Sequence, residues 1–445
     1  MTRHFRIRVA LATAITFSGI TSVLAVTLNQ AYAAPKIPLI KSSSSATVSE
    51  VSKPIDLIRF QQGFITAGYN NDEKSFLAFL DEKGGQVWRI NPLQDQQGFI
   101  TAIAASGNSI FATGISQGAV KNLPLDGASA IPSPAATTPA SATPTSKPTS
   151  TPTSTPTPTP GSSATKTIPL VNPDNVVVGK QEIFREDLNN LFVLEINSSG
   201  SVISLVNVPN NKLFLPSSIA TTNNLKYLVG DEYPSADTKR GALYVINDEG
   251  LVTSYSYGEK FTQFTKVIPR SSKSVIVVGS SSDTLAERKV IGKIDAVSLT
   301  ISTTSGKIEK VMRSSGATKS ALRSWDAGTG NLILAGTAQE KKLRESVISS
   351  FSPTGSVNWS TRFQNSDGAR VAGNCIAVSL LGASKSLSFA PTGAEIFLYT
   401  VDAKGKLQKG LRVAKQELIS LVTTANKGCA LLTYSADAGA RVSFL

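Results

Sequence analysis

The chain has 445 residues, two cysteines and one histidine, and its 44 Lys and Arg against 31 Asp and Glu give a formal net charge of +13. The histidine is His4, in a segment that we expect to be removed, so the rest of the chain lacks an imidazole for Ser-His-Asp or Cys-His catalysis or for metal binding. The cysteines form no Cys-x-x-Cys pair, and no strand leads through a Gly-rich loop into a helix. We therefore expect no metal and no cofactor.

The N-terminal segment, residues 1–33, has the pattern of a signal peptide. Three arginines at residues 3–8 precede an apolar run at 9–26, and the small-residue sequence Ala-Tyr-Ala ends at Ala33. This order is typical of secretory signals, and we expect cleavage before Ala34. An uncleaved membrane anchor is the alternative, because the apolar run is long for a signal. No lipid-attachment cysteine and no later apolar span follow, so we expect a secreted or cell-envelope, extracytoplasmic protein.

An apolar hairpin recurs about every 50 residues through residues 36–445, a period typical of repeat arrays. In each copy a strand ends in Gly, a second strand follows, and a turn of the type Asp/Asn/Ser-x-x-Gly leads to a third strand. Gly in this turn supplies the positive φ of a bulged hairpin. The first strands end at Gly68, Gly114, Gly230, Gly279 and Gly336, with weaker relatives at Ala390 and Tyr434; the turns begin at Asp81, Asn197, Asn247, Ser352 and Asp402, with Asp295 as a degenerate copy.

The repeats predict an all-β fold, a β-propeller of seven four-stranded blades, because the runs are short, rich in Val, Ile, Phe and Thr, and bounded by turn residues. Blade 1 comprises IDLIRF, FITAG, SFLAFLD and QVWRI as strands A to D. The A and B strands of the later blades are ITAIAAS/SIFATG, LPSSIATT/KYLVG, FTKVIPR/SVIVVG, SALRSWD/NLILAG, CIAVSLL/SLSFA and LISLVTT/CALLTY.

The last blade ends with RVSFL at the C-terminus and lacks its outermost strand. Either KIPLI or TVSEV, within residues 36–51, could supply this strand. Such a pairing of the two ends would close the ring and remove an exposed strand edge.

A Pro/Thr/Ser-rich tract at residues 119–170 interrupts blade 2, and we expect it to be disordered and solvated, and to carry glycans in one interpretation. It could be an interdomain linker. The repeat phase favours an insertion within the blade, with strands A and B before the tract and LFVLEIN and SVISLVN after it. NVVVG, ending at Gly179, matches strand B as well as FATG does, and the sequence does not decide between them.

Export makes a disulfide between Cys375 and Cys429 the first hypothesis. In the strand assignment above, however, Cys375 begins strand A of one blade and Cys429 begins strand B of the next. These strands run in opposite directions and begin at opposite rims, whereas a bridge needs Cα atoms within about 7 Å. We therefore favour two buried free thiols.

The two best repeat copies, LDEKGGQVW from Leu80 and FSPTGSVNW from Phe351, resemble the blades of secreted bacterial β-propeller repeat proteins. They also look like quinone-cofactor dehydrogenase repeats. The chain lacks kelch-type double glycines, repeated Trp-Asp strand ends and the sialidase Asp box. The resemblance implies a fold and does not specify a function.

Two groups of side chains are candidates for a site. Carboxylates in loops between strands B and C could act as the acid and base of a glycoside hydrolase or lyase, although their spacing does not distinguish them from solvated loop residues. Residues 70–73 lack the oxygen pattern of a calcium loop. Basic and aromatic residues on strand A could form a ligand-binding channel mouth, or could simply cover the core. The carboxylates are Asp231, Glu232, Asp237 and Asp283, and the channel residues are Lys266, Arg270, Arg323 and Trp325.

Removal of the signal peptide would leave a net charge of +10, because it takes three Arg and no acid. This charge favours an anionic envelope polymer or another surface protein as the partner, or it only keeps the protein soluble. Nucleic acid is not expected as a partner, because the basic residues are scattered and the predicted compartment is extracytoplasmic.

The predicted function is a non-enzymatic binding or scaffolding module. A histidine-free hydrolase or lyase and a purely structural envelope protein are the alternatives.

Overall fold

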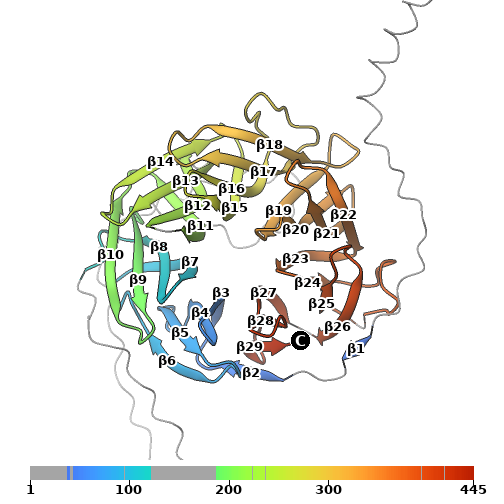
Figure 1. Ribbon diagram of the computed structural model, residues 1–445, viewed down its shortest axis with the longest axis horizontal. Coiled ribbons are helices and arrows are strands. Elements are labelled where there is room, and N and C mark those ends of the chain that lie inside the picture. Colours follow the sequence, from blue (N-terminus) through green and yellow to red (C-terminus); the bar gives the residue numbers. More distant parts are fainter. Residues whose placement is uncertain are drawn as a thin grey trace, which may run out of the picture.

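Seven β-sheets stand in a ring in the computed structural model of the chain (Figure 1), which describes residues 38–40, 44–94, 96–121, 187–222, 224–235, 237–391, 393–414 and 416–445. Within each blade, consecutive strands of the chain are antiparallel neighbours, from strand A nearest the centre of the ring to the outer edge. Two short N-terminal strands join blades 6 and 7 at their outer edges. The predicted all-β propeller of seven four-stranded blades is confirmed. Residues 1–33, predicted to be a signal peptide, lie outside the described residues.

The blades follow one another along the chain without crossing over. Blades 1 to 3 comprise β3 (Lys53–Phe60), β4 (Gly63–Tyr69), β5 (Ser75–Leu80) and β6 (Gln86–Ile90); β7 (Gly98–Ser106), β8 (Ser109–Ser116), β9 (Asn190–Asn197) and β10 (Val202–Pro209); and β11 (Leu213–Thr222), β12 (Leu225–Ser235), β13 (Thr238–Asn247) and β14 (Val252–Tyr257). Blades 4 and 5 comprise β15 (Thr262–Ser271), β16 (Ser274–Ser281), β17 (Asp295–Ser302) and β18 (Ile308–Ser314); and β19 (Leu322–Gly328), β20 (Ile333–Glu340), β21 (Leu343–Phe351) and β22 (Val357–Gln364). Blades 6 and 7 comprise β23 (Ser366–Ala372), β24 (Cys375–Leu380), β25 (Glu395–Val401) and β26 (Leu407–Ala414); and β27 (Glu417–Thr423), β28 (Cys429–Ser435) and β29 (Gly439–Phe444).

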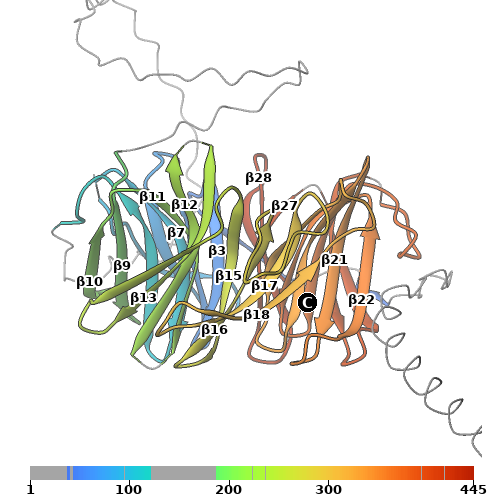
Figure 2. The same cartoon turned by 90° about the horizontal axis from the view of Figure 1, so that it is seen from above.

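The strands run between two rims of the ring (Figure 2). Because neighbouring strands alternate in direction, the B–C and D–A connections share one rim, here called the upper rim, and the A–B and C–D connections share the lower rim. Among the described residues, no helix has the length and hydrophobicity needed to cross a membrane.

The core is divided into wedges, one at each interface between neighbouring blades. Each of the seven clusters of buried apolar side chains combines residues of two adjacent blades, and the wedge between blades 7 and 1 includes Leu57, Phe76, Ala430 and Val442. Both faces of a blade are therefore buried. This explains why the inner strands are continuous apolar runs rather than alternating ones.

The recurring Gly of strand B faces a bulge in strand A. The pairing of strands A and B shifts by one residue beside each such Gly, for example between Pro216 and Ser218 opposite Gly230. The bulge pushes a strand A carbonyl toward the Gly, so a Cβ on Gly230 would lie 2.0 Å from the oxygen of Leu215. Only Gly tolerates this approach. Gly68, Gly114, Gly279 and Gly336 face strand A carbonyls in the same way.

Side chains at the bulges link neighbouring blades around the centre of the ring. Thr265 donates its hydroxyl to the carbonyl of Trp325 in the next blade at 2.6 Å, and Ser217 donates to the carbonyl of Phe264 at 2.5 Å. Across the junction of the chain ends, Ser420 of blade 7 donates to the carboxylate of Asp56 in blade 1 at 2.6 Å.

The C–D turns have the positive-φ Gly that the sequence predicts. In blade 1, the Asp81 carboxylate accepts from the backbone N–H groups of Lys83 and Gly85, and Gly84 has a φ of 84°. The glycines at the corresponding position in blades 2, 3, 5 and 6 also have positive φ. Blade 4 differs from the prediction, because Asp295 begins strand C and its C–D turn contains Gly306 instead.

The N-terminal segment closes the ring as predicted. β2 (Ser45–Val48) pairs with β29 in antiparallel orientation and supplies the missing outer strand of blade 7. β1 (Leu39–Ile40) adds a fifth strand to blade 6, parallel to β26. The N-terminal segment therefore joins both of the last two blades.

The interruption of blade 2 lies between its strands B and C. β8, which contains FATG, pairs along its length with β9, which begins at Asn190. This pairing confirms that the residues between them are inserted within one blade. NVVVG and residues 122–170 of the Pro/Thr/Ser-rich tract lie outside the described residues. Residues 119–121 are described, and Val120, 4% exposed, packs in the wedge between blades 1 and 2, so the prediction of a solvated tract is wrong at its start.

The strand assignment in blade 6 was wrong, and with it the prediction of two free thiols. Strand A is β23, so Cys375 begins strand B, and SLSFA lies in the B–C loop. Cys375 and Cys429 thus begin equivalent strands of adjacent blades at the same rim. They form a disulfide with a Cα–Cα distance of 5.8 Å in the wedge between blades 6 and 7.

Candidate functional site

The residues predicted to form a channel mouth lie at different levels of the ring. Trp325 is only 3% exposed and packs edge-on against Phe351 in the wedge between blades 4 and 5. Arg323 is half-buried at the upper-rim end of β19, whereas Arg270 is exposed at the lower-rim end of β15, with Lys266 half-buried between the rims. Both faces of strand A pack against neighbouring blades. The alternation of side chains along the strand therefore does not direct every second one toward the centre of the ring.

An acidic residue, Asp326, occupies the bulge of the innermost strand of blade 5. Its carboxylate is half-buried and accepts a hydrogen bond of 2.7 Å from the hydroxyl of Ser324. Burial raises the pKa of Asp326, while this hydrogen bond and the positive charge of Arg370 act in the opposite direction. Asp326 was not among the predicted site residues, because a bulge is not visible in the sequence.

Three of the four predicted rim carboxylates are held in separate polar networks. Asp231 pairs with Lys239 at 3.2 Å and accepts from a backbone N–H, while Glu232 pairs with Lys212 at 3.4 Å. Asp283 accepts from two backbone N–H groups and from the hydroxyl of Thr262 at 2.8 Å. These contacts anchor loops to neighbouring strands, and they favour structural roles for the three buried carboxylates.

Asp237 is exposed in the B–C connection of blade 3, and two hollows of about 350 and 360 Å³ lie on the same rim over blades 1 to 3. The second hollow contains the adjacent exposed carboxylates Asp72 and Glu73. The described residues contain no cluster of three or more His, Cys, Asp or Glu that could hold a metal ion.

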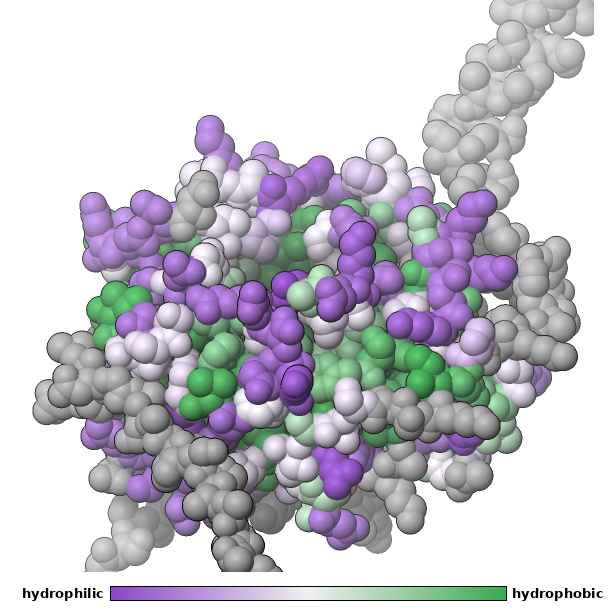
Figure 3. Space-filling view, turned by 60° about the horizontal axis from the view of Figure 1, so that its bottom comes forward, coloured by the Kyte–Doolittle hydropathy of each residue, from purple (hydrophilic) through white to green (hydrophobic). Residues whose placement is uncertain are grey.

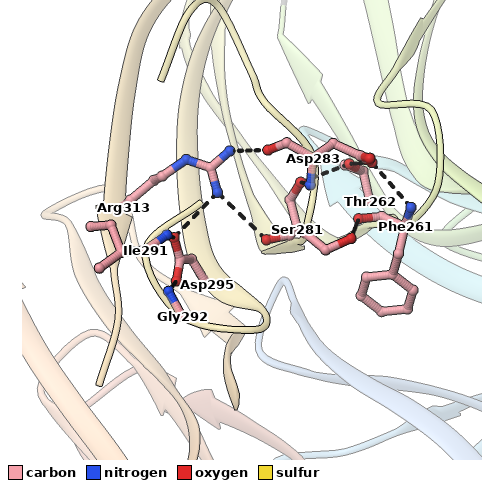
Figure 4. Close-up of polar contacts among 9 residues, drawn as sticks. Phe261, Thr262, Ser281, Asp283, Ile291, Gly292, Asp295 and Arg313 are labelled. Carbon is pink, nitrogen blue, oxygen red and sulfur yellow. Dashed lines mark hydrogen bonds and ion pairs between the residues drawn. The ribbon is translucent and has the colours of Figure 1, made fainter. Parts of the chain in front are cut away.

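The buried guanidinium of Arg313 organises the long B–C loop of blade 4, residues 282–294 (Figure 4). It donates to the carbonyl of Asp283 and, at 3.4 Å, to the fully buried carboxylate of Asp295. The same carboxylate accepts from the backbone N–H groups of Ile291 and Gly292 at 2.8 and 2.9 Å. Burial lowers the pKa of Arg313, and the charge of Asp295 opposes that effect. The loop is thus fixed at both ends.

The charges of the chain are divided unequally around the ring. From Lys260, just before blade 4, to the C-terminus, 25 Lys and Arg against 12 Asp and Glu give a net charge of +13. Residues 1–259 contain 19 of each and are neutral, so blades 4 to 7 account for the whole net charge. The net charge of the whole chain hides this division, and no dense basic run in the sequence marks it.

Most acids that pair in the basic half of the ring do so with arginine. The pairs are Arg313 with Asp295, Arg344 with Asp367, Arg362 with Glu345 and Arg412 with Glu395. Many lysines in this half remain exposed, and in the space-filling view hydrophilic side chains separate the apolar patches on the face shown (Figure 3).

Exposed cations gather on the upper rim over blades 4 and 5. We call this group the basic rim; it consists of Arg288, Lys289 and Lys293 in the B–C loop of blade 4, Lys319 in the connection to blade 5, and Lys341 and Lys342 in the B–C turn of blade 5. The described part of the chain offers these six side chains no ion pair or side-chain hydrogen bond. Two acids, Glu287 and Glu340, lie among them. The arrangement leaves positive charge available to a partner.

The sequence matches no known protein-family model and no curated protein. The structure is similar to that of a streptogramin B lyase, with a TM-score of 0.47 and 9% identity over 90% of this chain and 97% of the other. It is also similar to the WD40 domain of coronin from Toxoplasma gondii, with a TM-score of 0.43 and 9% identity over 92% and 88%. An ancestral GH74 enzyme shares a TM-score of 0.45 and 11% identity over 90% of this chain and 51% of its own. Similarities at this level do not assign an activity to the chain.

Proposed function

We propose that this protein is a secreted or cell-envelope binding module, without enzymatic activity, that attaches to an anionic partner through the basic half of its propeller. The observation that supports this most directly is that residues 260–445 carry a net charge of +13, whereas residues 1–259 are neutral. Charge spread evenly would serve solubility alone, whereas charge on one side attracts and orients an anionic surface or polymer.

The ion pairs in that half strengthen the proposal. Four arginines are bound to acids of the fold, so the unpaired charge is mostly lysine on mobile, solvated side chains. Such side chains suit contact with a polymer of repeated negative charges better than recognition of one small ligand. The buried rim carboxylates, in contrast, are already bound to lysines, backbone N–H groups or hydroxyls.

The test is the binding of labelled long-chain polyphosphate and of an acidic glycan to the purified protein, measured by fluorescence anisotropy as salt is raised. We expect binding at low salt that weakens steeply as screening increases, and none to neutral dextran. The triple variant Lys289→Gln, Lys341→Gln, Lys404→Gln should bind more weakly. Its matched control, Lys53→Gln, Lys83→Gln, Lys121→Gln, removes the same charge from blades 1 and 2 and should bind almost normally. Absence of binding to every polyanion at low salt would refute the proposal.

A further inference from the structure

The loops that carry the basic rim form one continuous surface. The backbone N–H of Lys293 donates to the carbonyl of Ala321 at 2.9 Å, and the N–H of Arg323 donates to the carbonyl of Ile294 at 3.0 Å. The B–C loop of blade 4 thus continues into the connection that begins blade 5. Gly316 of this connection lies against the carboxylate of Glu340, beside the B–C turn of blade 5.

Apolar side chains project from the same loops. Ile291 is 62% exposed among the cations of the blade 4 loop, and Leu343 is 42% exposed directly after Lys342. Leu381, at the start of the B–C loop of blade 6, is 51% exposed, with Lys385 in the same loop. A single exposed apolar residue needs no explanation. Here three successive blades each place one beside cations on the same rim.

The position of Ile291 is fixed by the fold. Its backbone N–H and that of Gly292 are bound by the buried carboxylate of Asp295, which Arg313 holds in turn. This network keeps the apolar tip on the outside of the loop instead of allowing it to fold back against the blade. An exposed side chain that is held in place loses little conformational entropy when a partner covers it.

On the rest of the upper rim, exposed carboxylates accompany exposed lysines such as Lys74, Lys212 and Lys260. The B–C connections of blades 1, 3 and 7 expose the carboxylates of Asp72, Glu73, Asp237 and Asp437. A flat anionic surface would therefore attract the side of blades 4 to 6 more strongly than the other side. We therefore expect the ring to tilt on such a surface, with the upper rim of blades 4 to 6 nearest to it.

Resting on the function proposed above, we propose that the basic rim, with Ile291, Leu343 and Leu381, docks on an anionic lipid bilayer. The cations meet headgroup phosphates, and the three apolar side chains enter the boundary between headgroups and acyl chains. This combination of charge and apolar insertion is what interfacial binding requires. A soluble polyanion would use the cations and leave the apolar residues in water.

The test measures co-flotation of the purified protein with vesicles of phosphatidylcholine alone or with one third phosphatidylglycerol. Only the anionic vesicles should carry the protein. Arg288→Gln, Lys289→Gln, Lys293→Gln should reduce partitioning by about five-fold per charge, roughly 100-fold in total. The matched lower-rim variant Lys404→Gln, Lys406→Gln, Lys409→Gln should lose less than about three-fold, because those charges face away from the bilayer and are screened.

A second pair of variants separates lipid insertion from charge attraction. Ile291→Ser, Leu343→Ser should lower vesicle partitioning about ten-fold and leave polyphosphate binding unchanged. The control Leu251→Ser, Val357→Ser removes equally exposed apolar side chains at the outer strands and should change neither. Melting curves verify that each variant is folded.

The two proposals fail in different ways. Binding to polyphosphate without binding to anionic vesicles, or vesicle binding that is indifferent to Ile291 and Leu343, would overturn the lipid proposal and leave the proposed function in place. Binding to neither would overturn both.

Discussion

Replacement of Gly279 by Ala tests whether the recurring Gly exists because of the strand A bulge. A Cβ at this position would lie 1.9 Å from the carbonyl oxygen of Gln263 and 3.0 Å from the Cα of Phe264. Carbon and carbonyl oxygen in neighbouring strands ordinarily remain about 3.3 Å apart, so strand A would have to retreat by roughly 1.4 Å. Overpacking of this kind costs about 1–3 kcal/mol, and the lower entropy of the unfolded Ala chain offsets about 0.4–1 kcal/mol.

We therefore expect Gly279→Ala to reduce the free energy of unfolding in a urea titration by about 2 kcal/mol. The control is Gly330→Ala, because Gly330 is exposed in an A–B turn and no atom lies within 4 Å of its Cβ position. It should change the stability by less than about 0.5 kcal/mol. If the two variants are equally stable, the bulge does not explain the repeated Gly.

Three further changes test the disulfide between blades 6 and 7, the burial of Asp326 and the role of Arg313 in fixing the B–C loop of blade 4. Cys375→Ala, Cys429→Ala removes a bridge between residues 54 apart and should cost about 4 kcal/mol of unfolding free energy; equal stability of this variant and the oxidised protein would contradict that. The raised pKa of Asp326 means that the folded protein holds this proton more tightly than the unfolded chain, so stability is lost as pH rises through the folded pKa. Asp326→Asn should consequently be more stable than the natural protein at pH 7, and the difference should vanish below about pH 3.9; a destabilised variant at pH 7 would contradict the assignment. Arg313→Met leaves the carboxylate of Asp295 buried without its counter-charge, which should cost about 3 kcal/mol and expose the blade 4 loop to trypsin; unchanged cleavage would show that Arg313 does not anchor the loop.

Only part of the candidate site can be predicted from the sequence. The division of charge was present in the sequence and could be found by summing each half. The basic rim could not be found in this way. Its six cations come from three loops that approach one another only when blades 4 and 5 pack side by side. Trp325 shows the reverse error: its neighbours in sequence suggested a channel mouth, but the adjacent blade buries it.

Local signals in the sequence determined the blade count, the C–D turns and the closing strand, because each depends on a few consecutive residues: a positive-φ Gly, an acceptor at the turn and a short apolar run. The strands of blade 6 cannot be assigned by these signals, because its strand B ends at Leu380 without the usual Gly. The shifted assignment places Cys375 on strand A and hides the disulfide. Tertiary structure alone decided the bulges, the bridge between Cys375 and Cys429 and the position of the cations. These depend on contacts between blades, such as that of Ser420 with Asp56, 364 residues away in the chain, and such contacts form only when the ring closes.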